Sequence, residues 1–317
     1  MIYITDYIND KSFEQSLTKK KVYHFNDVNV NKDAIEAVIT WHENVDKSFL
    51  NQFKNLRFVQ RYGVGFDTID LEECKKRKIR VANVPDYGTE EVSNSAISLI
   101  LNLLRGSSRY DFISRELCNK KSQTWQENVI HDLRRLSEQN LLVIGLGRIG
   151  GRVARLLTPF FNKISFYDPY VSEYASYKKY ENLYEAIKNS DVISLHCPLN
   201  NVTSGLVNKK FINSMKKGAC LVNTARGGLI GDLNEILSAL KHNIIYGFAT
   251  DVLVDEPPKY SDEYIKEFLK NKDLSGRLII NPHTSYYSNE SFAFMRKEAI
   301  KNVNNFLIGK KIKNIIL

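Results

Sequence analysis

The chain has 317 residues, of which 43% are hydrophobic and 26% are charged, and its formal net charge is +9. The length predicts two domains, and the composition is typical of a soluble globular protein rather than a disordered or membrane chain. The basic residues are scattered and not gathered in a stripe, which argues against nucleic-acid binding, and no apolar run approaches the ~18 residues of a membrane span.

The N-terminus and the cysteines narrow the class of protein further. Residues 1–10 contain no basic segment followed by an apolar one, so they lack the pattern of a secretory signal, and we expect a cytoplasmic protein. The four cysteines form no CxxC pair and have no neighbouring histidine in metal-ligand spacing. We therefore expect neither a disulfide framework nor a metal site.

The first hundred residues alternate short apolar runs with polar helical stretches, which is the pattern of a parallel α/β unit. A long amphipathic helix follows, with Glu90 and Glu91 in its first turn, and it is expected to end near Arg105. Strands are expected at residues 2–5, 22–25, 37–40, 57–60 and 79–82.

A second alternating series begins at Leu141, and its six expected strands have helices between most of them. These strands are residues 141–145, 163–167, 191–195, 219–223, 245–249 and 278–281. The last segment, from Asn289 to about Leu307, is amphipathic, and we expect a helix that returns to the first domain. The sequence thus predicts an α/β protein with two doubly wound, parallel-sheet, Rossmann-like domains.

A glycine motif supplies the strongest local signal, because GxGxxG at residues 145–150 follows an apolar strand and opens a helix. Gly145 allows a tight turn, Gly147 lets the backbone approach a pyrophosphate, and Gly150 lets the helix pack on the strand. Asp168 ends the next strand, where a carboxylate would bind the ribose diol of a dinucleotide and repel a 2′-phosphate. The pattern therefore predicts NAD as cofactor, the alternative being an ordinary glycine-rich turn beside a surface aspartate.

Three later segments each end a strand of the second domain, and ligands of such sheets bind outside the carboxyl ends of the strands. These segments contain Arg226, Glu256 and His283. A histidine can accept the proton of a hydroxy acid near neutral pH, a neighbouring carboxylate would stabilise the imidazolium, and an arginine matches a substrate carboxylate. Each residue alone has an ordinary structural explanation, and only their shared position at strand ends favours catalysis.

Several motifs resemble those of the D-isomer-specific 2-hydroxyacid dehydrogenases over nearly the full chain. Within that family, residues 83–91 and 286–288 are most similar to the branch of the C-terminal-binding-protein corepressors and their bacterial relatives. The family motifs are residues 61–70 (RYGVGFDTID), 83–85 (NVP), 196–199 (HCPL) and 281–284 (NPHT).

The resemblance implies a domain arrangement and catalytic roles. Residues 1–104 and 286–317 would form a flavodoxin-like substrate domain, into which an NAD-binding Rossmann domain of residues 105–285 is inserted, with hydride transfer in the cleft between them. Arg226 would bind the substrate carboxylate and carbonyl, His283 would be the acid/base, and Glu256 would support His283.

The resemblance also implies which residues line the substrate side, namely Arg61, Val64, Gly65 and Tyr286. Arg61 falls where the corepressor branch has a carboxylate-binding arginine, although it could also be an edge-strand residue that faces water. The glycines after it would let a substrate oxygen reach backbone N–H groups. Tyr286 stands where the corepressor branch has tryptophan, so we expect a different preference for the substrate side chain.

Cofactor contacts are implied for residues of several segments. Asp251 would contact the nicotinamide amide, Arg148 and Ile149 would lie against the pyrophosphate, and Pro198 would border the adenine end. The full set is Gly145, Gly147, Arg148, Ile149, Gly150, Asp168, His196, Cys197, Pro198, Thr203, Thr224, Ala225, Arg226, Asp251 and His283.

We therefore expect an NAD-dependent D-2-hydroxyacid dehydrogenase that acts on a small anionic 2-keto or 2-hydroxy acid, similar to glyoxylate, hydroxypyruvate or phosphoglycerate. The alternative is an NADH-sensing, corepressor-like binding protein with incidental dehydrogenase activity. The segment from Tyr110 to about Arg135, which includes Trp125, has more apolar and aromatic residues than one domain edge covers. We expect it to pack against a second copy in a homodimer.

Overall fold

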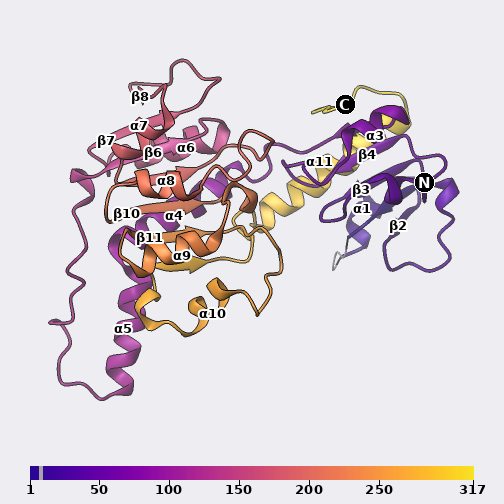
Figure 1. The fold of residues 1–317 in the computed structure, drawn as a ribbon. Coiled ribbons are helices and arrows are strands. Elements are labelled where there is room, and N and C mark those ends of the chain that lie inside the picture. Colours follow the sequence, from indigo (N-terminus) through magenta and orange to yellow (C-terminus); the bar gives the residue numbers. More distant parts are fainter. Residues whose placement is uncertain (7–9) are drawn as a thin grey trace. The chain divides into compact units, whose positions relative to one another are not determined.

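The computed structural model describes residues 1–6 and 10–317, and this part of the chain forms two compact α/β units (Figure 1). Unit 1 consists of Met1–Thr89 and Tyr286–Leu317, and unit 2 of Glu90–Ser285. The first boundary lies earlier than the expected one after residue 104. The reason is that the apolar side of helix α4 (Thr89–Arg105), including Leu99 and Leu103, is part of a core cluster of unit 2.

Unit 1 contains a five-stranded parallel sheet in the order β2-β1-β3-β4-β5. This is the strand order of flavodoxin-like folds. The five expected strands are present, and no end is shifted by more than one residue. They are β1 (Ile2–Ile4), β2 (Val22–His24), β3 (Ala37–Thr40), β4 (Phe58–Arg61) and β5 (Arg80–Ala82).

Helices cover both faces of the unit 1 sheet, which explains why its strands are apolar without alternation. The C-terminal helix α11 (Asn289–Leu307) has the predicted bounds, and its buried side chains, among them Met295 and Ile300, pack with Ile4 and Phe58 of the sheet. The remaining helices of this unit are α1 (Ser12–Ser16), η1 (Lys32–Ala34), α2 (Lys47–Leu50) and α3 (Leu71–Lys76).

Unit 2 contains a seven-stranded parallel sheet in the order β12-β11-β10-β9-β6-β7-β8, which includes the Rossmann order. The six expected strands are present as β6 (Asn140–Ile144), β7 (Lys163–Tyr167), β9 (Val192–Leu195), β10 (Ala219–Asn223), β11 (Ile245–Thr250) and β12 (Leu278–Ile280). The seventh, β8 (Lys178–Lys179), was not predicted, because a two-residue edge strand carries no apolar pattern.

Helices on the two faces of this sheet complete a doubly wound domain (Figure 1). Besides α4, the helices of this unit are α5 (Ser107–Asn119), η2 (Leu136–Glu138), α6 (Arg148–Leu157), α7 (Leu183–Lys188), α8 (Lys209–Ser214), η3 (Gly227–Leu229), α9 (Leu233–Lys241), α10 (Glu263–Lys270) and η4 (Lys272–Leu274). No helix in the described part of the chain is long and apolar enough to cross a membrane.

Helix α5 and the segment after it extend away from the sheet of unit 2 (Figure 1). No residue of α5 is buried, and in the following segment Trp125 is 57% exposed and Val129 is 52% exposed. The far end of the segment is held to the sheet, because Arg134 forms an ion pair of 2.9 Å with the buried carboxylate of Asp191. The chain thus presents apolar surface on an extension fixed at both ends.

Candidate active site

The glycine loop between β6 and α6 shows which of its glycines the fold itself requires. Gly145 has φ +89°, and a Cβ there would lie 2.5 Å from the Cys197 nitrogen, while a Cβ at Gly150 would lie 2.1 Å from the Gly145 oxygen. Gly147 differs, because its φ of −75° suits any residue and a Cβ there would meet no atom within 4 Å. The open space at Gly147 is what a pyrophosphate would need.

Asp168 follows β7 directly, and hydrogen bonds tie it to the glycine loop. Its Oδ2 accepts from the Leu146 N–H at 2.8 Å, and its Oδ1 accepts from the N–H groups of Tyr170 and Val171 at 2.8 and 3.2 Å. The structure therefore brings together the carboxylate and the glycine loop that the sequence spacing had paired.

The segment after β9 lies against the same loop. The His196 Nε2 is 2.8 Å from the Ser194 hydroxyl, and burial lowers the pKa of His196 to about 4, so this imidazole is neutral at neutral pH. Burial also raises the pKa of Cys197 to about 11. The Thr203 hydroxyl donates to the Pro198 oxygen at 2.6 Å and holds the segment in a tight turn.

His283 and Glu256 form a direct pair in unit 2. The His283 Nδ1 lies 2.7 Å from Glu256 Oε2, and Glu256 Oε1 accepts from the Leu253 N–H at 2.7 Å. Burial alone would raise the pKa of Glu256, but the hydrogen bonds from His283 and Leu253 outweigh it, so the pKa lies below the usual value. A carboxylate thus orients the imidazole.

Asp251 clamps the turn that contains His283. His283 has φ +54°, a left-handed conformation that residues other than glycine rarely adopt. The backbone N–H of His283 donates to the backbone oxygen of Asp251 at 2.8 Å. The backbone N–H groups of Thr284 and Ser285 donate to the two carboxylate oxygens of Asp251 at 2.9 and 3.0 Å. The Asp251 side chain, expected to contact the nicotinamide amide, therefore also holds the backbone around His283. Burial raises its pKa.

Arg226 follows β10, which lies beside β11 in the sheet. The buried Asn223 shapes this strand end, because its Oδ1 accepts from the Ala225 N–H at 3.1 Å and its Nδ2 donates to the Arg226 oxygen at 2.9 Å. The Arg226 Nη1 donates to the Ala225 oxygen at 2.8 Å. A Cβ at Gly227 would lie 1.9 Å from the Leu253 oxygen, so this turn packs against the segment that leads to Glu256.

In unit 1, Arg61 ends β4 and organises the loop after it. Its Nε donates to the Gly65 oxygen at 2.8 Å and its Nη1 to the Thr40 oxygen at 3.2 Å. The next residue, Tyr62, is fully buried, and its hydroxyl donates to the buried Glu14 carboxylate at 2.8 Å. No residue that the structure describes accepts a hydrogen bond from the N–H of Val64 or of Gly65.

Tyr286 belongs to an aromatic group of unit 1. Its ring meets Trp41 edge-on, with centroids 5.7 Å apart, and its centroid lies 6.0 Å from that of Tyr87. The backbone N–H of Trp41 donates to the Asp6 carboxylate at 2.7 Å. Trp41 was not singled out in the sequence analysis, although it directly follows β3, at a carboxyl strand end where ligands of such sheets bind.

Comparison with known proteins identifies the family. Residues 97–285, more than half of the chain, match the family model described as "D-isomer specific 2-hydroxyacid dehydrogenase, NAD binding domain". The chain belongs to the D-isomer-specific 2-hydroxyacid dehydrogenases. It is therefore an oxidoreductase of CH–OH donors, and NAD is its cofactor. The narrower similarity to the corepressor branch stays a prediction.

Individual relatives are similar in sequence to this dehydrogenase over most of its length. A glyoxylate reductase of Thermococcus litoralis is 33% identical over 90% of this chain and 83% of its own. A D-lactate dehydrogenase of Staphylococcus aureus is 31% identical over 72% of this chain and 68% of its own. The solved structure of a D-lactate dehydrogenase of Aquifex aeolicus, complexed with NAD and lactic acid, has a TM-score of 0.81 and 28% identity, over 98% of this chain and 96% of its own.

The residues of this dehydrogenase fit a dinucleotide. Besides the open space at Gly147, the Thr224 hydroxyl is buried at the end of β10 and has no partner among the described residues. A buried hydroxyl of this kind needs a hydrogen-bond partner, which a bound molecule could supply.

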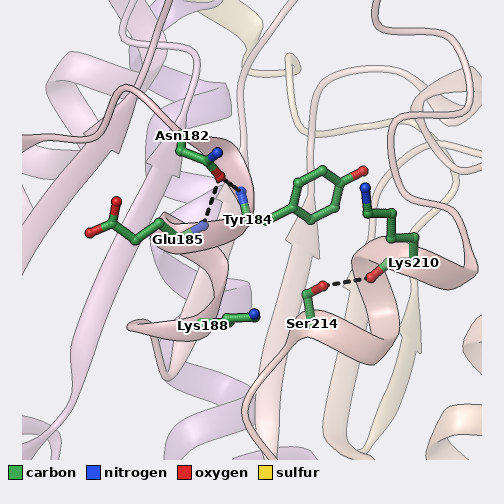
Figure 2. Close-up of a pocket in the computed structure, with 6 residues that line it drawn as sticks. All are labelled: Asn182, Tyr184, Glu185, Lys188, Lys210 and Ser214. Carbon is green, nitrogen blue, oxygen red and sulfur yellow. Dashed lines mark hydrogen bonds between the residues drawn. The ribbon is translucent and has the colours of Figure 1, made fainter.

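A surface pocket of about 430 Å³ between α7 and α8 is a separate feature of unit 2 (Figure 2). The Lys210 Nζ lies 4.2 Å from the centroid of the Tyr184 ring, and the Ser214 hydroxyl donates to the Lys210 oxygen at 2.8 Å. The pocket contains none of the predicted site residues. Its lining residues are Asn182, Tyr184, Glu185, Lys188, Lys210 and Ser214.

Proposed function

We propose that this dehydrogenase transfers a hydride between NAD(H) and the C2 atom of a small anionic 2-keto or D-2-hydroxy acid. The observation that carries the proposal is the 2.7 Å pair of His283 and Glu256. The two residues follow the neighbouring strands β12 and β11, and Arg226 follows β10, the next strand of the same sheet. The relatives named glyoxylate reductase and D-lactate dehydrogenase support a small substrate. We propose glyoxylate, hydroxypyruvate or a phosphoglycerate-like acid.

The proposed reduction combines carboxylate binding with proton transfer. Arg61 and the N–H groups of Val64 and Gly65 bind the substrate carboxylate, and Arg226 polarises the keto group. When bound, the reduced cofactor supplies the hydride. Protonated His283 donates its proton to the keto oxygen as the hydride reaches C2, so that keto acid, NADH and H⁺ give hydroxy acid and NAD⁺.

Glu256 is the residue that makes the charged histidine favourable in this scheme. Its carboxylate stabilises the imidazolium before proton transfer and keeps the ring oriented afterwards. In the opposite direction, neutral His283 removes the hydroxyl proton. The glycine loop, with Arg148 and Ile149, would hold the cofactor at its pyrophosphate, Asp168 would bind its ribose, and Asp251 would bind its nicotinamide amide.

The further cofactor contacts proposed for this dehydrogenase come from the segment after β9 and the turn after β10. The pKa of His196, lowered to about 4, keeps that ring uncharged and suits it to a dinucleotide-lining position rather than to proton transfer. The residues of these two segments are His196, Cys197, Pro198, Thr203, Thr224 and Ala225.

A substrate panel tests the proposed reaction. Purified protein is mixed with NADH and with glyoxylate, hydroxypyruvate, pyruvate and 3-phosphohydroxypyruvate in turn, and NADH oxidation is followed. We expect turnover with at least one acid, and chiral analysis of a product with a C2 stereocentre should show the D-isomer. NADH binding without turnover on any member of the panel would contradict the proposal and favour an NADH-sensing protein.

We also propose that the enzyme is a cytoplasmic homodimer. The extension of α5 and the segment after it exposes Trp125 and Val129, and a second copy would cover this apolar surface. All four cysteines are free and Cys118 is exposed, as suits a reducing compartment. Sedimentation at micromolar concentration should show a dimer and Trp125→Glu should weaken it, whereas a wild-type monomer would overturn this assignment.

A further inference from the structure

The loop of residues 63–65 has its backbone carbonyls turned toward the protein. The Gly63 oxygen accepts from the Val84 N–H at 3.0 Å, and the Val64 oxygen accepts from the Asn83 side-chain Nδ2 at 2.7 Å. The Gly65 oxygen accepts from an arginine side chain, as described above. Gly63 has φ +117°, which only glycine adopts readily, so the loop can take this arrangement.

The orientation of these carbonyls decides where the loop N–H groups point. In a trans peptide, the carbonyl of one residue and the N–H of the next point to opposite sides, and the only cis peptide in the described residues lies elsewhere. The bond to the Gly63 oxygen therefore directs the Val64 N–H away from residues 83–84. The bond to the Val64 oxygen directs the Gly65 N–H away in the same manner.

The two N–H groups have the properties of an anion-binding concavity. They are consecutive, they both point away from residues 83–84, and no acceptor for either lies within the described parts of the chain. Consecutive backbone N–H groups of this kind attract carboxylates and phosphates. Val84 orients the first of them through its backbone, which any residue except proline could do. The second depends on a side chain, that of Asn83.

We propose that Asn83 is a positioning residue, whose side-chain amide sets the Val64–Gly65 peptide plane and so aims the Gly65 N–H at the substrate carboxylate. This inference rests on the proposed function, in which the loop binds that carboxylate. Asn83 is 8% exposed, and its backbone N–H donates to the Asn314 oxygen at 3.2 Å, so its main chain is held independently of the amide.

The chemistry of the contact explains why an amide is required at position 83. Only a side-chain donor can hold the Val64 oxygen, and a carboxylate there would place lone pairs against it. Without the donor, the peptide plane is free to rotate. The Val64 oxygen would then turn toward the substrate carboxylate and repel it, while the Gly65 N–H would be lost as a donor. The defect should therefore appear in substrate affinity.

Asn83→Asp and Asn83→Ser test this proposal together. Asp preserves the shape and removes the donor, while Ser removes the amide without adding charge. Loss of one charge-assisted hydrogen bond should raise KM for the best 2-keto acid roughly 10- to 100-fold in Asn83→Asp and less in Asn83→Ser. The NADH Kd, measured by fluorescence, should stay within about twofold of the wild-type value, because the cofactor residues belong to unit 2.

Asn55→Asp is the matched control. Asn55 lies in the same unit, and its Nδ2 also donates to a backbone oxygen at 2.7 Å, but this oxygen belongs to Asp33 and not to the loop. We expect its KM to equal the wild-type KM. The proposal is overturned if both Asn83 variants keep the wild-type KM, even with a lowered Tm, or if Asn55→Asp raises KM as much.

Oxalate binding to the NADH-bound protein separates this inference from the proposed function. Oxalate presents a carboxylate without being reduced, so its Kd reports the loop even if no acid of the panel turns over. A wild-type protein that binds oxalate without turnover would contradict the proposed reaction, and a weaker oxalate Kd in Asn83→Asp would still support the role of Asn83. An unchanged oxalate Kd in both Asn83 variants would refute it.

Discussion

Two loops of this dehydrogenase are proposed to hold an anion through backbone N–H groups, and they are stabilised in opposite ways. The glycine loop of unit 2 keeps its shape because side chains are absent, since a Cβ at Gly145 or Gly150 would collide with backbone atoms. The loop of residues 63–65 keeps its shape because side chains are present, those of Arg61 and Asn83. The first design relies on packing and the second on hydrogen bonds.

The difference teaches that two anion sites of similar chemistry leave unequal traces in a sequence. Packing limits of the first kind demand glycines at fixed spacing, which are visible in the chain. Hydrogen bonds of the second kind join residues that are far apart in sequence, and the residue types involved are common. The comparison also predicts different responses to substitution, from the largest effect to the smallest.

His283→Ala should have the largest effect, because it removes the proposed general acid and leaves both loops intact. The kcat of keto-acid reduction should fall roughly 100-fold or more. Because the glycine loop remains, the NADH Kd should stay within a few-fold of the wild-type value. A kcat within a few-fold of the wild-type value would show that His283 does not donate the proton.

Gly150→Ala and Gly147→Ala should separate what the fold needs from what the cofactor needs. A methyl group at position 150 would overlap the Gly145 oxygen, so the free energy of unfolding should fall by about 2 kcal/mol or more. A methyl group at position 147 has space, so Gly147→Ala should keep the wild-type Tm and bind NADH about 10-fold more weakly.

Thermal unfolding and NADH titration of both glycine variants provide the check. Equal loss of Tm in the two variants would mean that the open space at Gly147 has another purpose. If folded Gly147→Ala bound NADH with the wild-type Kd, the pyrophosphate would not bind at this loop.

Asp168→Asn should weaken the preference of the enzyme for NADH over NADPH. The amide keeps an acceptor near the glycine loop, but it removes the charge that would repel a 2′-phosphate. We expect the NADPH affinity to rise relative to the NADH affinity by about 10-fold. Titration with both cofactors measures the ratio of the two affinities. An unchanged ratio would show that Asp168 does not bind the ribose.

The smallest predicted effect is a pH dependence set by Glu256. Its pKa lies below the usual value, so its carboxylate stays charged as the pH falls through the ordinary glutamate range. Below that lowered pKa the neutral carboxyl no longer stabilises the imidazolium. The kcat of reduction should therefore decline only below the ordinary glutamate range. Glu256→Gln should lower kcat and lack this acid limb, whereas an identical limb in the variant would assign it to another group.

Local patterns in the sequence were enough to predict most of the fold. Among the residues that the structure describes, apolar periodicity located eleven of the twelve strands and the bounds of α11, and it missed the two-residue β8. It placed the amphipathic helix α4 correctly but not its domain, because an apolar stripe shows which face is buried and not which sheet covers it.

For the candidate site, the sequence by itself singled out residues whose proposed role depends on local spacing, such as the glycine loop, Asp168 after the next strand, and His283 at a strand end. Only the tertiary structure decided which distant residues form hydrogen bonds with the loops of the site. Asp251 reaches Thr284 across 33 positions, and Asn83 reaches Val64 across 19. A hydrogen bond between distant segments depends on the path of the whole backbone, so no local pattern of residues can reveal it.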